Sequence, residues 1–503
     1  MTDGKALMVQ GTSSSAGKSL LITALCRIFA RKGVRVAPFK AQNMSNNAAV
    51  CQDGSEIGRA QAVQAAAAGL EPTVDMNPIL IKPEADARSQ VIVMGKPWKR
   101  LDARDYYPQK TFLWETVTSA LDRLRSQYDL VLIEGAGSPV EMNLKKNDIV
   151  NMAVARYAQS PVLLVGDIDR GGIFSQLLGT YWLLPEEEQE LLAGFIINKF
   201  RGDISLFKEG PEFIEEKSSR QVFGVVPYLP GLLIPEEDSV ALQNLKPVSP
   251  NQDYQVEIAV IHLPRISNFD DFMPLQSESG VQIRYVQNPD QLGDPDAIIL
   301  PGSKSTLADL SWLSTSGLAD SIISFAHSGG SVVGICGGYQ MLGKNVKDPE
   351  RVESRHKSQN GLNLLPISTH FEIKKQTYQA QGKIISTAGW MKAINGLEIS
   401  GYEIHQGQSH GTDPWLEINQ RSGKPVQVLD GSTASDGKVW GCYLHGIFEN
   451  HKFRRAWLRS LGANLEENLQ TTSNPFTSSL TLLADTVESS LDMNAIEELT
   501  WEN

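Results

Sequence analysis

The chain has 503 residues, of which 41% are hydrophobic and 21% are charged, and its formal net charge is -12. This length exceeds what one hydrophobic core usually supports, so we expect at least two domains, and the composition excludes an intrinsically disordered chain. The acidic charge argues against nucleic acid or an anionic membrane surface as a partner. The four cysteines lack CxxC spacing, which excludes a disulfide framework or a structural zinc site. Because neither a secretory signal nor a run of about 18 apolar residues is visible, we expect a cytoplasmic protein.

The first half of the chain, residues 1–240, alternates short apolar runs with helical stretches. Helices are expected from Gly17 to about Arg31 and over the alanine-rich segment 56–68. The apolar runs typical of strands buried on both faces are 6–10, 34–39, 130–135, 161–167, 194–198 and 222–227. Strands that alternate with helices predict an α/β domain with a parallel sheet flanked by helices.

The second half begins after a segment that lacks any sustained periodicity. Four prolines between 228 and 254 predict a linker at 241–254. A second α/β domain is expected over 255–455, with strand-like runs at 256–261, 283–287, 297–302 and 331–336 and a shift toward β structure from 364 to 445. The remaining residues, 456–503, form an acidic tail. An amphipathic helix docked on the body is predicted there by the spacing of Leu480, Leu483, Ala484, Val487 and Leu491.

A glycine-rich loop, GTSSSAGKS (11–19), lies between the first expected strand and the first expected helix. Such a loop presents successive backbone N–H groups to a phosphate, and the helix N-terminus adds its dipole, so Gly11, Thr12 and Gly17 are candidates for nucleotide binding. Lys18 would reach the outer phosphates of ATP, and the Ser19 hydroxyl would bind Mg²⁺. Five residues separate the two glycines where four are usual. The alternative is a chance Gly/Ser-rich loop.

Three further polar residues are candidates for the same site. Glu134 ends an expected buried strand, where it could hold Mg²⁺ directly or through water, because an unpaired buried carboxylate is costly. The alternative is a strand-terminal Glu that faces solvent. Asp53 is a second candidate metal ligand. Asn198 also ends a strand and could read the adenine edge, and a turn-forming Asn is the alternative.

In the second half, SVVGICGGYQML (331–342) places Cys336 between an expected strand and a helix. The surrounding glycines permit a tight turn that presents the thiol at a helix N-terminus, the arrangement of a nucleophile elbow. Gly337 and Gly302, the latter in PGSKST (301–306), are candidates for an oxyanion hole. A thiolate nucleophile needs an acid/base partner, and His445 follows a β run about 110 residues later.

Ordered motifs link the two halves to one family. They are VQGTSSSAGKS, PFKAQNMSNNA, EIGRAQAVQA, VDMNPILIKP, EGAGSPVEMNL, DIDRGGIF, INKFRGD, PGSKST, GICGGYQML, GYEIHQG and YLHGIFE. With these motifs the chain resembles the cobyric acid synthase family of cobalamin biosynthesis over nearly its whole length. The resemblance implies a dethiobiotin-synthetase-like P-loop domain fused to a class I glutamine amidotransferase domain of the cobyrinate type. It also implies ATP- and glutamine-dependent amidation of the b, d, e and g carboxylates of adenosylcobyrinic acid a,c-diamide, giving adenosylcobyric acid.

The resemblance also implies roles for particular residues. Cys336 would be the glutaminase nucleophile and His445 its acid/base partner. Many class I amidotransferases carry a Glu two residues after the His, but Ile447 stands there in this chain, so Glu449 or another group would orient His445. The candidates for contacting the corrinoid are Lys40, Asn43, Asn143 and Asp148. We also predict a basic lining for the polycarboxylate substrate from Lys40, Lys82 and Arg88.

Two alternatives stay open at this point. One is the sister enzyme that makes the a,c-diamide with the same chemistry on an earlier substrate. The other is a P-loop switch ATPase with an inert amidotransferase-like module. Such ATPases typically carry a second lysine early in the loop, and many have a basic membrane-targeting tail. This chain has neither feature.

Overall fold

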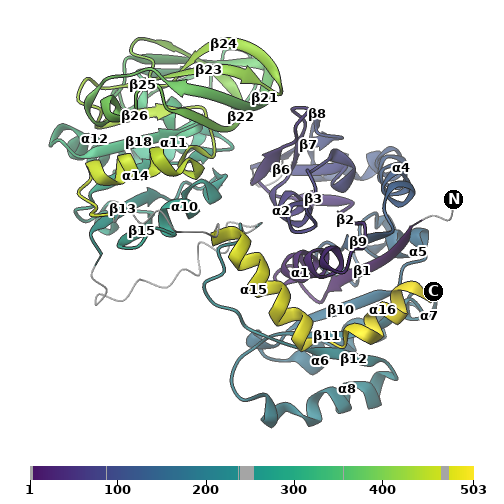
Figure 1. Ribbon diagram of the computed structural model, residues 1–503. Helices are drawn as coiled ribbons and strands as arrows, with labels where there is room; N and C mark the ends of the chain where they lie inside the picture. Colours follow the sequence, from purple (N-terminus) through teal and green to yellow (C-terminus); the bar gives the residue numbers. More distant parts are fainter. Residues whose placement is uncertain are drawn as a thin grey trace.

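The computed structural model describes residues 4–85, 88–235, 237, 254–354, 356–465 and 475–502. The chain forms two α/β domains, whose colours in Figure 1 run from purple to teal in the first half and from teal to yellow-green in the second. The predicted linker 241–254 lies outside the described residues except for Tyr254. Within the described part of the chain, no helix has the length and apolar character needed to cross a bilayer.

The first domain is built on a six-stranded parallel sheet with the order β12-β11-β10-β1-β9-β2. Each of the six expected apolar runs forms one of its strands. The strands are β1 (Lys5–Gly11), β2 (Val36–Phe39), β9 (Leu130–Glu134), β10 (Val162–Asp167), β11 (Leu192–Phe200) and β12 (Gln221–Pro227). Because all strands are parallel, the carboxyl ends of β1, β9, β10 and β11 meet at one edge of the sheet, where the phosphate loop also begins.

Helices cover both faces of this sheet, which explains why its strands are apolar throughout. Alternate strand residues enter two separate cores: Met8 packs on one face, whereas Leu7 and Val9 pack on the other. The helices are α1 (Lys18–Arg31), α2 (Arg59–Ala67), α3 (Ala103–Tyr106), α4 (Lys110–Gln127), α5 (Met152–Ala158), α6 (Ile173–Leu183), α7 (Glu186–Gln189) and α8 (Glu209–Ser218).

Two small β structures project from this domain, and the sequence patterns did not predict them. One is a four-stranded sheet of β3 (Gln42–Met44), β6 (Ile79–Ala85), β7 (Arg88–Val93) and β8 (Lys96–Asp102). The other is a hairpin of β4 (Ala48–Val50) and β5 (Glu56–Gly58). The helix expected over 56–68 therefore begins only at Arg59. Glu56 is held in the strand by ion pairs with Lys82 and Lys375, which outweigh its helical propensity.

The second domain contains a mixed sheet and a separate, mostly antiparallel β layer. The mixed sheet has the order β15-β13-β16-β18-β26-β25. Its strands are β13 (Val256–Ile261), β15 (Val281–Val286), β16 (Ala297–Leu300), β18 (Ser331–Ile335), β25 (Ser432–Thr433) and β26 (Val439–Cys442). The β layer holds β19 (Asn345–Lys347), β20 (Ser358–Asn360), β21 (Ile367–Ile384), β22 (Glu398–Gly411), β23 (Leu416–Arg421) and β24 (Lys424–Asp430).

Short elements complete the second domain. A two-stranded pair, β14 (Ile266–Ser267) and β17 (Gly302–Ser303), lies beside the mixed sheet's carboxyl end. The helices are α10 (Met273–Gln276), α11 (Thr306–Thr315), α12 (Leu318–His327), α13 (Gly337–Leu342) and α14 (His451–Ser460).

The end of the chain returns to the first domain. Helices α15 (Pro475–Ser490) and α16 (Met493–Trp501), in yellow, lie beside α1 and the first sheet rather than on the second domain (Figure 1). The five apolar residues with helical spacing in the tail are buried in the same core as α1: Leu480, Leu483, Ala484, Val487 and Leu491. This helix pair therefore forms part of the first domain's helical cover.

The two domains share an interface of mixed character. Its apolar part joins residues of the first domain with two residues of β22: Ala48, Val50, Leu80 and Ile92 with Tyr402 and Ile404. Its polar part includes the ion pairs Lys375–Glu56 and Lys304–Glu84, the latter at 3.0 Å. These contacts bring the second domain's β22 against the hairpin and small sheet of the first.

Candidate active sites

The phosphate loop is shaped by a glycine that precedes α1. Gly17 has φ +100°, in the left-handed region, and a Cβ there would lie 2.1 Å from Asn198 Nδ2. Only glycine fits this close approach. Lys18 opens the helix, and its buried ammonium donates hydrogen bonds to Ser13 O at 2.7 Å and Gly137 O at 3.2 Å. Lys18 therefore lies across the loop, where a bound nucleotide's phosphates would meet it.

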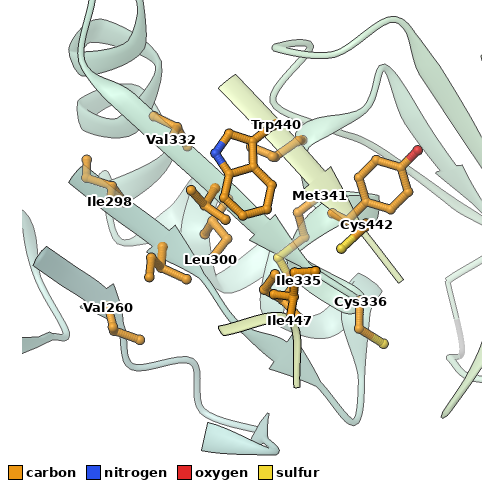
Figure 2. Close-up of a cluster of buried hydrophobic side chains, with 14 of the residues drawn as sticks. Val260, Ile298, Leu300, Val332, Ile335, Cys336, Met341, Trp440, Cys442 and Ile447 are labelled. Atoms are coloured by element: carbon orange, nitrogen blue, oxygen red, sulfur yellow. The ribbon is translucent and has the colours of Figure 1, made fainter. Parts of the chain in front are cut away.

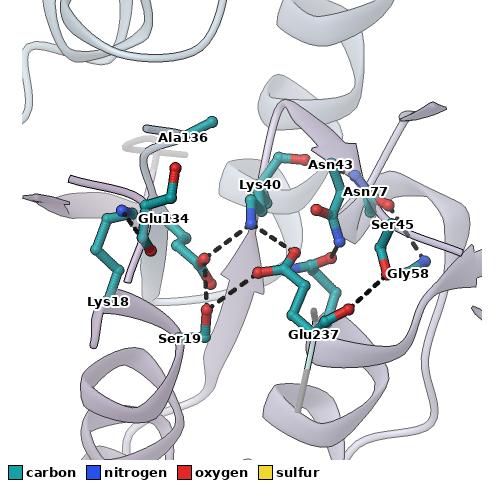
Figure 3. Close-up of polar contacts among 12 residues, drawn as sticks. Lys18, Ser19, Lys40, Asn43, Ser45, Gly58, Asn77, Glu134, Ala136 and Glu237 are labelled. Carbon is teal, nitrogen blue, oxygen red and sulfur yellow. Dashed lines mark hydrogen bonds and ion pairs between the residues drawn. The ribbon is translucent and has the colours of Figure 1, made fainter. Parts of the chain in front are cut away.

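A polar cluster next to this loop joins Ser19, Lys40, Glu134 and Glu237 (Figure 3). The Ser19 hydroxyl donates to Glu134 Oε1 at 2.8 Å, and Lys40 Nζ lies 2.9 Å from the same oxygen and 2.7 Å from Glu237 Oε1. Burial alone would raise the pKa of Glu134, but Lys40 and the hydrogen bonds from Gln64 and Ser19 lower it. Glu134 is therefore a carboxylate held ionised in a buried site.

This donor set fits Mg²⁺. The Ser19 hydroxyl, at the start of α1, and a carboxylate oxygen of Glu134, at the end of β9, lie 2.8 Å apart, and both are hard oxygen ligands of the type Mg²⁺ prefers. Within the described residues no three His, Cys, Asp or Glu side chains gather as a metal cluster. Mg²⁺ does not need one, because it usually combines one or two protein oxygens with water and phosphate.

Asn198 and Lys199, near the end of β11, donate hydrogen bonds to the backbone of the phosphate loop. The Asn198 side chain donates to Ala16 O at 2.9 Å, so its amide N–H is occupied by the loop backbone; adenine reading stays a prediction. Lys199 donates to Ser15 O at 2.7 Å and pairs with Asp167 at 2.9 Å. The sequence analysis missed Lys199. Its position directly after Asn198 at the strand end was the available signal.

Asp53 and Asn43 do not reach the phosphate loop through their described contacts. Asp53 accepts hydrogen bonds from the backbone N–H and the hydroxyl of Ser55 within the turn between β4 and β5. The metal role predicted for it gains no support from this position. Asn43 is buried and donates to Gln61 Oε1 at 3.0 Å, so it joins β3 to α2.

The two candidates after β9 lie in a surface segment. The Asp148 carboxylate accepts hydrogen bonds from the backbone N–H groups of Val150, Asn151 and Ala153, at the start of α5. It therefore satisfies backbone donors at this helix N-terminus. Asn143 is exposed. Corrinoid contact by either residue stays a prediction.

The three residues named for a basic lining have different surroundings in the structure. Lys40 is paired in the nucleotide site, whereas Lys82 lines the pocket that holds Cys336. The Arg88 side chain is 46% exposed, and its Nε lies 3.9 Å from Glu84 Oε2. Lys82 pairs with Glu56, which also pairs with Lys375 of the second domain, so β6 reaches that domain; the basic lining stays a prediction.

The cysteine elbow is built by close backbone packing. Cys336 has φ +51° and is the residue just before α13, and a Cβ at Gly338 would lie 1.9 Å from Leu300 O. The strained turn is therefore possible only with glycine at 338. Cys336 lies at the edge of the core cluster formed by β18 and β26 (Figure 2). Its sulfur lies 3.8 Å from Ile404 O and lines a pocket of about 60 Å³ with His445.

His445 is oriented by Asp271, a residue that the sequence analysis did not single out. His445 Nδ1 lies 2.6 Å from Asp271 Oδ2, and the other carboxylate oxygen accepts the Gly446 N–H at 2.9 Å. Burial alone would lower the pKa of His445, but the Asp271 carboxylate, with Cys336, raises it to about 10. Asp271, rather than Glu449, contacts the imidazole, so Cys336, His445 and Asp271 have the arrangement of a triad.

The loop after β16 adjoins the elbow. A Cβ at Gly302 would lie 3.1 Å from His445 Cε1, and a Cβ at Gly337 would lie 2.8 Å from the backbone nitrogen of Ser303. The backbone of 302–303 therefore contacts both the imidazole and the start of α13. This is where a tetrahedral oxyanion would need its donors, and the oxyanion role of Gly302 and Gly337 stays a prediction.

Comparison with known proteins matches a family to each of the two domains. Residues 7–240 match a model described as the CobQ/CobB/MinD/ParA nucleotide binding domain, and residues 257–453 match the CobB/CobQ-like glutamine amidotransferase domain. Cobyric acid synthase from Herpetosiphon aurantiacus is 53% identical over 98% of both chains, and that from Chloroflexus aurantiacus is 54% identical over 98% of both. The protein of that name from Roseiflexus castenholzii is 53% identical over 93% of this chain and 94% of its own.

The chain belongs to the cobyric acid synthase family. The predicted family, the two-domain α/β fold and the enzyme class, a glutamine-hydrolysing and ATP-dependent amide ligase of cobalamin biosynthesis, are thereby confirmed. The matched domains also account for the two separate sites, one that binds nucleotide and one that acts on glutamine.

Proposed function

We propose that this enzyme amidates the b, d, e and g carboxylates of adenosylcobyrinic acid a,c-diamide to give adenosylcobyric acid. Each amide would consume one ATP and one glutamine. A carboxylate is a poor electrophile, so its oxygen must first be converted to a leaving group, which is the use of ATP. The identity of the close relatives supports the corrinoid substrate.

In the glutaminase site, the Cys336 thiolate attacks the side-chain amide carbon of glutamine, and a C–S bond forms. His445, as imidazolium, gives its proton to the departing nitrogen, and ammonia leaves as the C–N bond breaks. The neutral imidazole then takes a proton from the water that attacks the thioester carbon, the C–S bond breaks, and glutamate leaves as the Cys336 thiolate is restored. Asp271 keeps the imidazole in one tautomer and orientation throughout.

In the nucleotide site, Lys18 stabilises charge as the γ-phosphate moves to a substrate carboxylate oxygen and ADP leaves. Ser19 and Glu134 would hold Mg²⁺, which would neutralise phosphate charge when bound. Ammonia from the other domain then attacks the acyl carbon, inorganic phosphate departs, and the amide forms. Thr12 and the backbone of Gly11 and Gly17 would position the phosphates.

One observation carries the proposal: Cys336 and His445 line a single pocket, with His445 paired to Asp271, in a chain that also carries a formed phosphate loop. We propose a cytoplasmic location, where the Cys336 thiol stays reduced.

The test is to supply the purified enzyme with MgATP, glutamine and each corrinoid separately, and to count the added amides by mass spectrometry. The a,c-diamide should gain four amides, whereas cobyrinic acid itself should be a poor substrate. Amidation of cobyrinic acid that stops at two amides would instead identify the sister reaction. ATP hydrolysis without any amide product would favour the switch ATPase.

A further inference from the structure

Arg59 belongs to the P-loop domain, yet its side chain enters the glutaminase domain. It is the first residue of α2, and its Nε lies 3.0 Å from Asp270 Oδ2. The same guanidinium donates a hydrogen bond to the Tyr402 hydroxyl, and its Cζ lies 5.2 Å from the centre of the Tyr402 ring. The planar guanidinium thus holds two groups of the second domain at once.

Both partners of Arg59 adjoin the catalytic histidine. Asp270 directly precedes Asp271, which accepts the His445 Nδ1 hydrogen bond. The Tyr402 ring stacks on the His445 imidazole, with the ring centres 5.1 Å apart and the planes 14° from parallel. The two residues also exchange backbone hydrogen bonds, at 3.1 and 2.9 Å. Any shift of Asp270 or Tyr402 would therefore be transmitted to His445.

A second contact from the P-loop domain fixes the same segment. Asn47 Oδ1 accepts the backbone N–H of Asn268 at 2.7 Å, and the Asn268 side chain donates to the Tyr402 hydroxyl at 2.8 Å. Asn268 begins the short segment 268–271 with φ +52°, a left-handed conformation that asparagine adopts readily. The P-loop domain contacts both ends of this segment, through Asn47 and Arg59.

Arg59 also balances the negative charge of two neighbouring carboxylates. Asp270 and Asp271 are consecutive, buried carboxylates, 8% and 4% exposed, and both belong to the same turn. Burial raises the pKa of Asp270, and the Asp271 charge raises it further, whereas Arg59 opposes the shift. Without a cation beside it, Asp270 would either repel Asp271 or change its own protonation, and in both cases the turn would rearrange.

We propose that Arg59 is a positioning residue of the glutaminase site that is contributed by the P-loop domain. It acts through Asp270 and Tyr402 on Asp271 and His445, and it touches none of the reacting atoms. Glutamine hydrolysis consequently depends on the contact between the domains. The helix that carries Arg59 also carries Gln64, which donates to Glu134 at 2.6 Å, so α2 contacts both active sites. This inference rests on the proposed glutaminase role of Cys336 and His445.

The test compares Arg59→Met, Arg59→Lys, Asp270→Asn and the double variant Arg59→Met/Asp270→Asn in the full chain. Two reactions are measured for each: glutamine hydrolysis, with kcat and KM separated, and amidation driven by ammonium salt. Arg123→Met is the matched control, because Arg123 forms a surface ion pair with Asp75.

We expect Arg59→Met to lower kcat for glutamine hydrolysis by about 10- to 100-fold with KM changed less than about twofold, as for other residues that orient a catalytic group. Asp270→Asn should cause a similar loss. Because Asp270 acts only through the contact that Arg59→Met already removes, the double variant should lose no more than Arg59→Met alone. Arg59→Lys should recover part of kcat, since it keeps the charge and loses the fork geometry. Ammonium-driven amidation should stay near that of the control.

Unchanged glutamine hydrolysis in Arg59→Met would overturn the inference, as would strictly additive losses in the double variant. Parallel loss of both reactions in Arg59→Met and Asp270→Asn, with a lowered melting temperature, would assign Arg59 a purely structural role. Failure of the proposed function looks different: glutamine hydrolysis would then survive replacement of Cys336.

Discussion

The imidazole Nδ1 of His445 lies 2.6 Å from the carboxylate of Asp271, a residue 174 positions earlier in the chain. This pair supplies the orienting group that the residue two positions after the histidine, Ile447, cannot provide. The contact joins the loop after β26 to the turn after β14, which the mixed sheet brings to the same edge.

Replacing Asp271 by Asn should lower kcat for glutamine hydrolysis by about 10²- to 10⁴-fold, because the imidazole loses its orienting carboxylate. Ammonium-driven amidation should be retained. Asp320→Asn, at an exposed position on α12, serves as the control. Equal hydrolysis rates in the two variants would remove Asp271 from the triad.

The pH dependence should change in the same variant. The pKa of His445 is raised to about 10, so the imidazolium needed to protonate ammonia persists up to that pH in the parent enzyme. In Asp271→Asn the pKa of His445 should fall, and the alkaline limb of the kcat profile should move to lower pH. The ion pair between His445 and Asp271 also contributes to the free energy of unfolding. This contribution is fully present below about pH 6.5 and is lost as the pH rises through about 10. A profile of hydrolysis rate against pH from 6 to 11 measures the shift.

Cys336→Ala should abolish glutamine hydrolysis and glutamine-dependent amidation, since no thioester can form, while ammonium-driven amidation continues. A loss of at least about 10³-fold is expected. Cys26→Ala is the matched control, because Cys26 is a buried cysteine of α1 in the core of the other domain. Glutamine-dependent amidation by Cys336→Ala would contradict the elbow assignment.

Lys18→Met should lower amidation with glutamine and with ammonium salt alike, by about 10²-fold or more, because charge on the transferring phosphoryl group is no longer stabilised. Lys32→Met, at the opposite end of the same helix, should retain both activities, since Lys32 forms surface ion pairs of small energetic value. The test is to measure the rates of amidation with glutamine and with ammonium salt for both variants. A variant at Lys18 that keeps ammonium-driven amidation would exclude the lysine from phosphoryl transfer.

The docking of α15 can be tested with two neighbouring leucines. Leu483 is 3% exposed and packs in the core with α1, whereas Leu482 is 52% exposed. Leu483→Ala should lower the free energy of unfolding by about 2–4 kcal/mol, whereas Leu482→Ala should change it by less than about 0.5 kcal/mol. Urea denaturation provides both values. Similar effects from the two substitutions would mean that α15 does not pack through this face.

Several features followed from the sequence because their physical cause is local. The phosphate loop and the cysteine elbow each depend on glycines within a few residues, since left-handed turns and close backbone contacts need a residue without a side chain at that point. The parallel strands were recognisable because burial on both faces demands an unbroken apolar run, as in 130–135 and 161–167. The tail helix followed from the spacing of its leucines.

Tertiary structure decided which distant polar groups meet. Nothing in the local pattern around Asp271 distinguishes it from Asp270, yet one pairs with His445 and the other with Arg59. Lys82 was grouped with Lys40 in the predicted lining for the substrate, and the course of β6 takes it to the pocket of Cys336. The reason is physical: a glycine turn depends on the backbone of its neighbours, whereas a charge pair depends on the path of two segments through the whole fold.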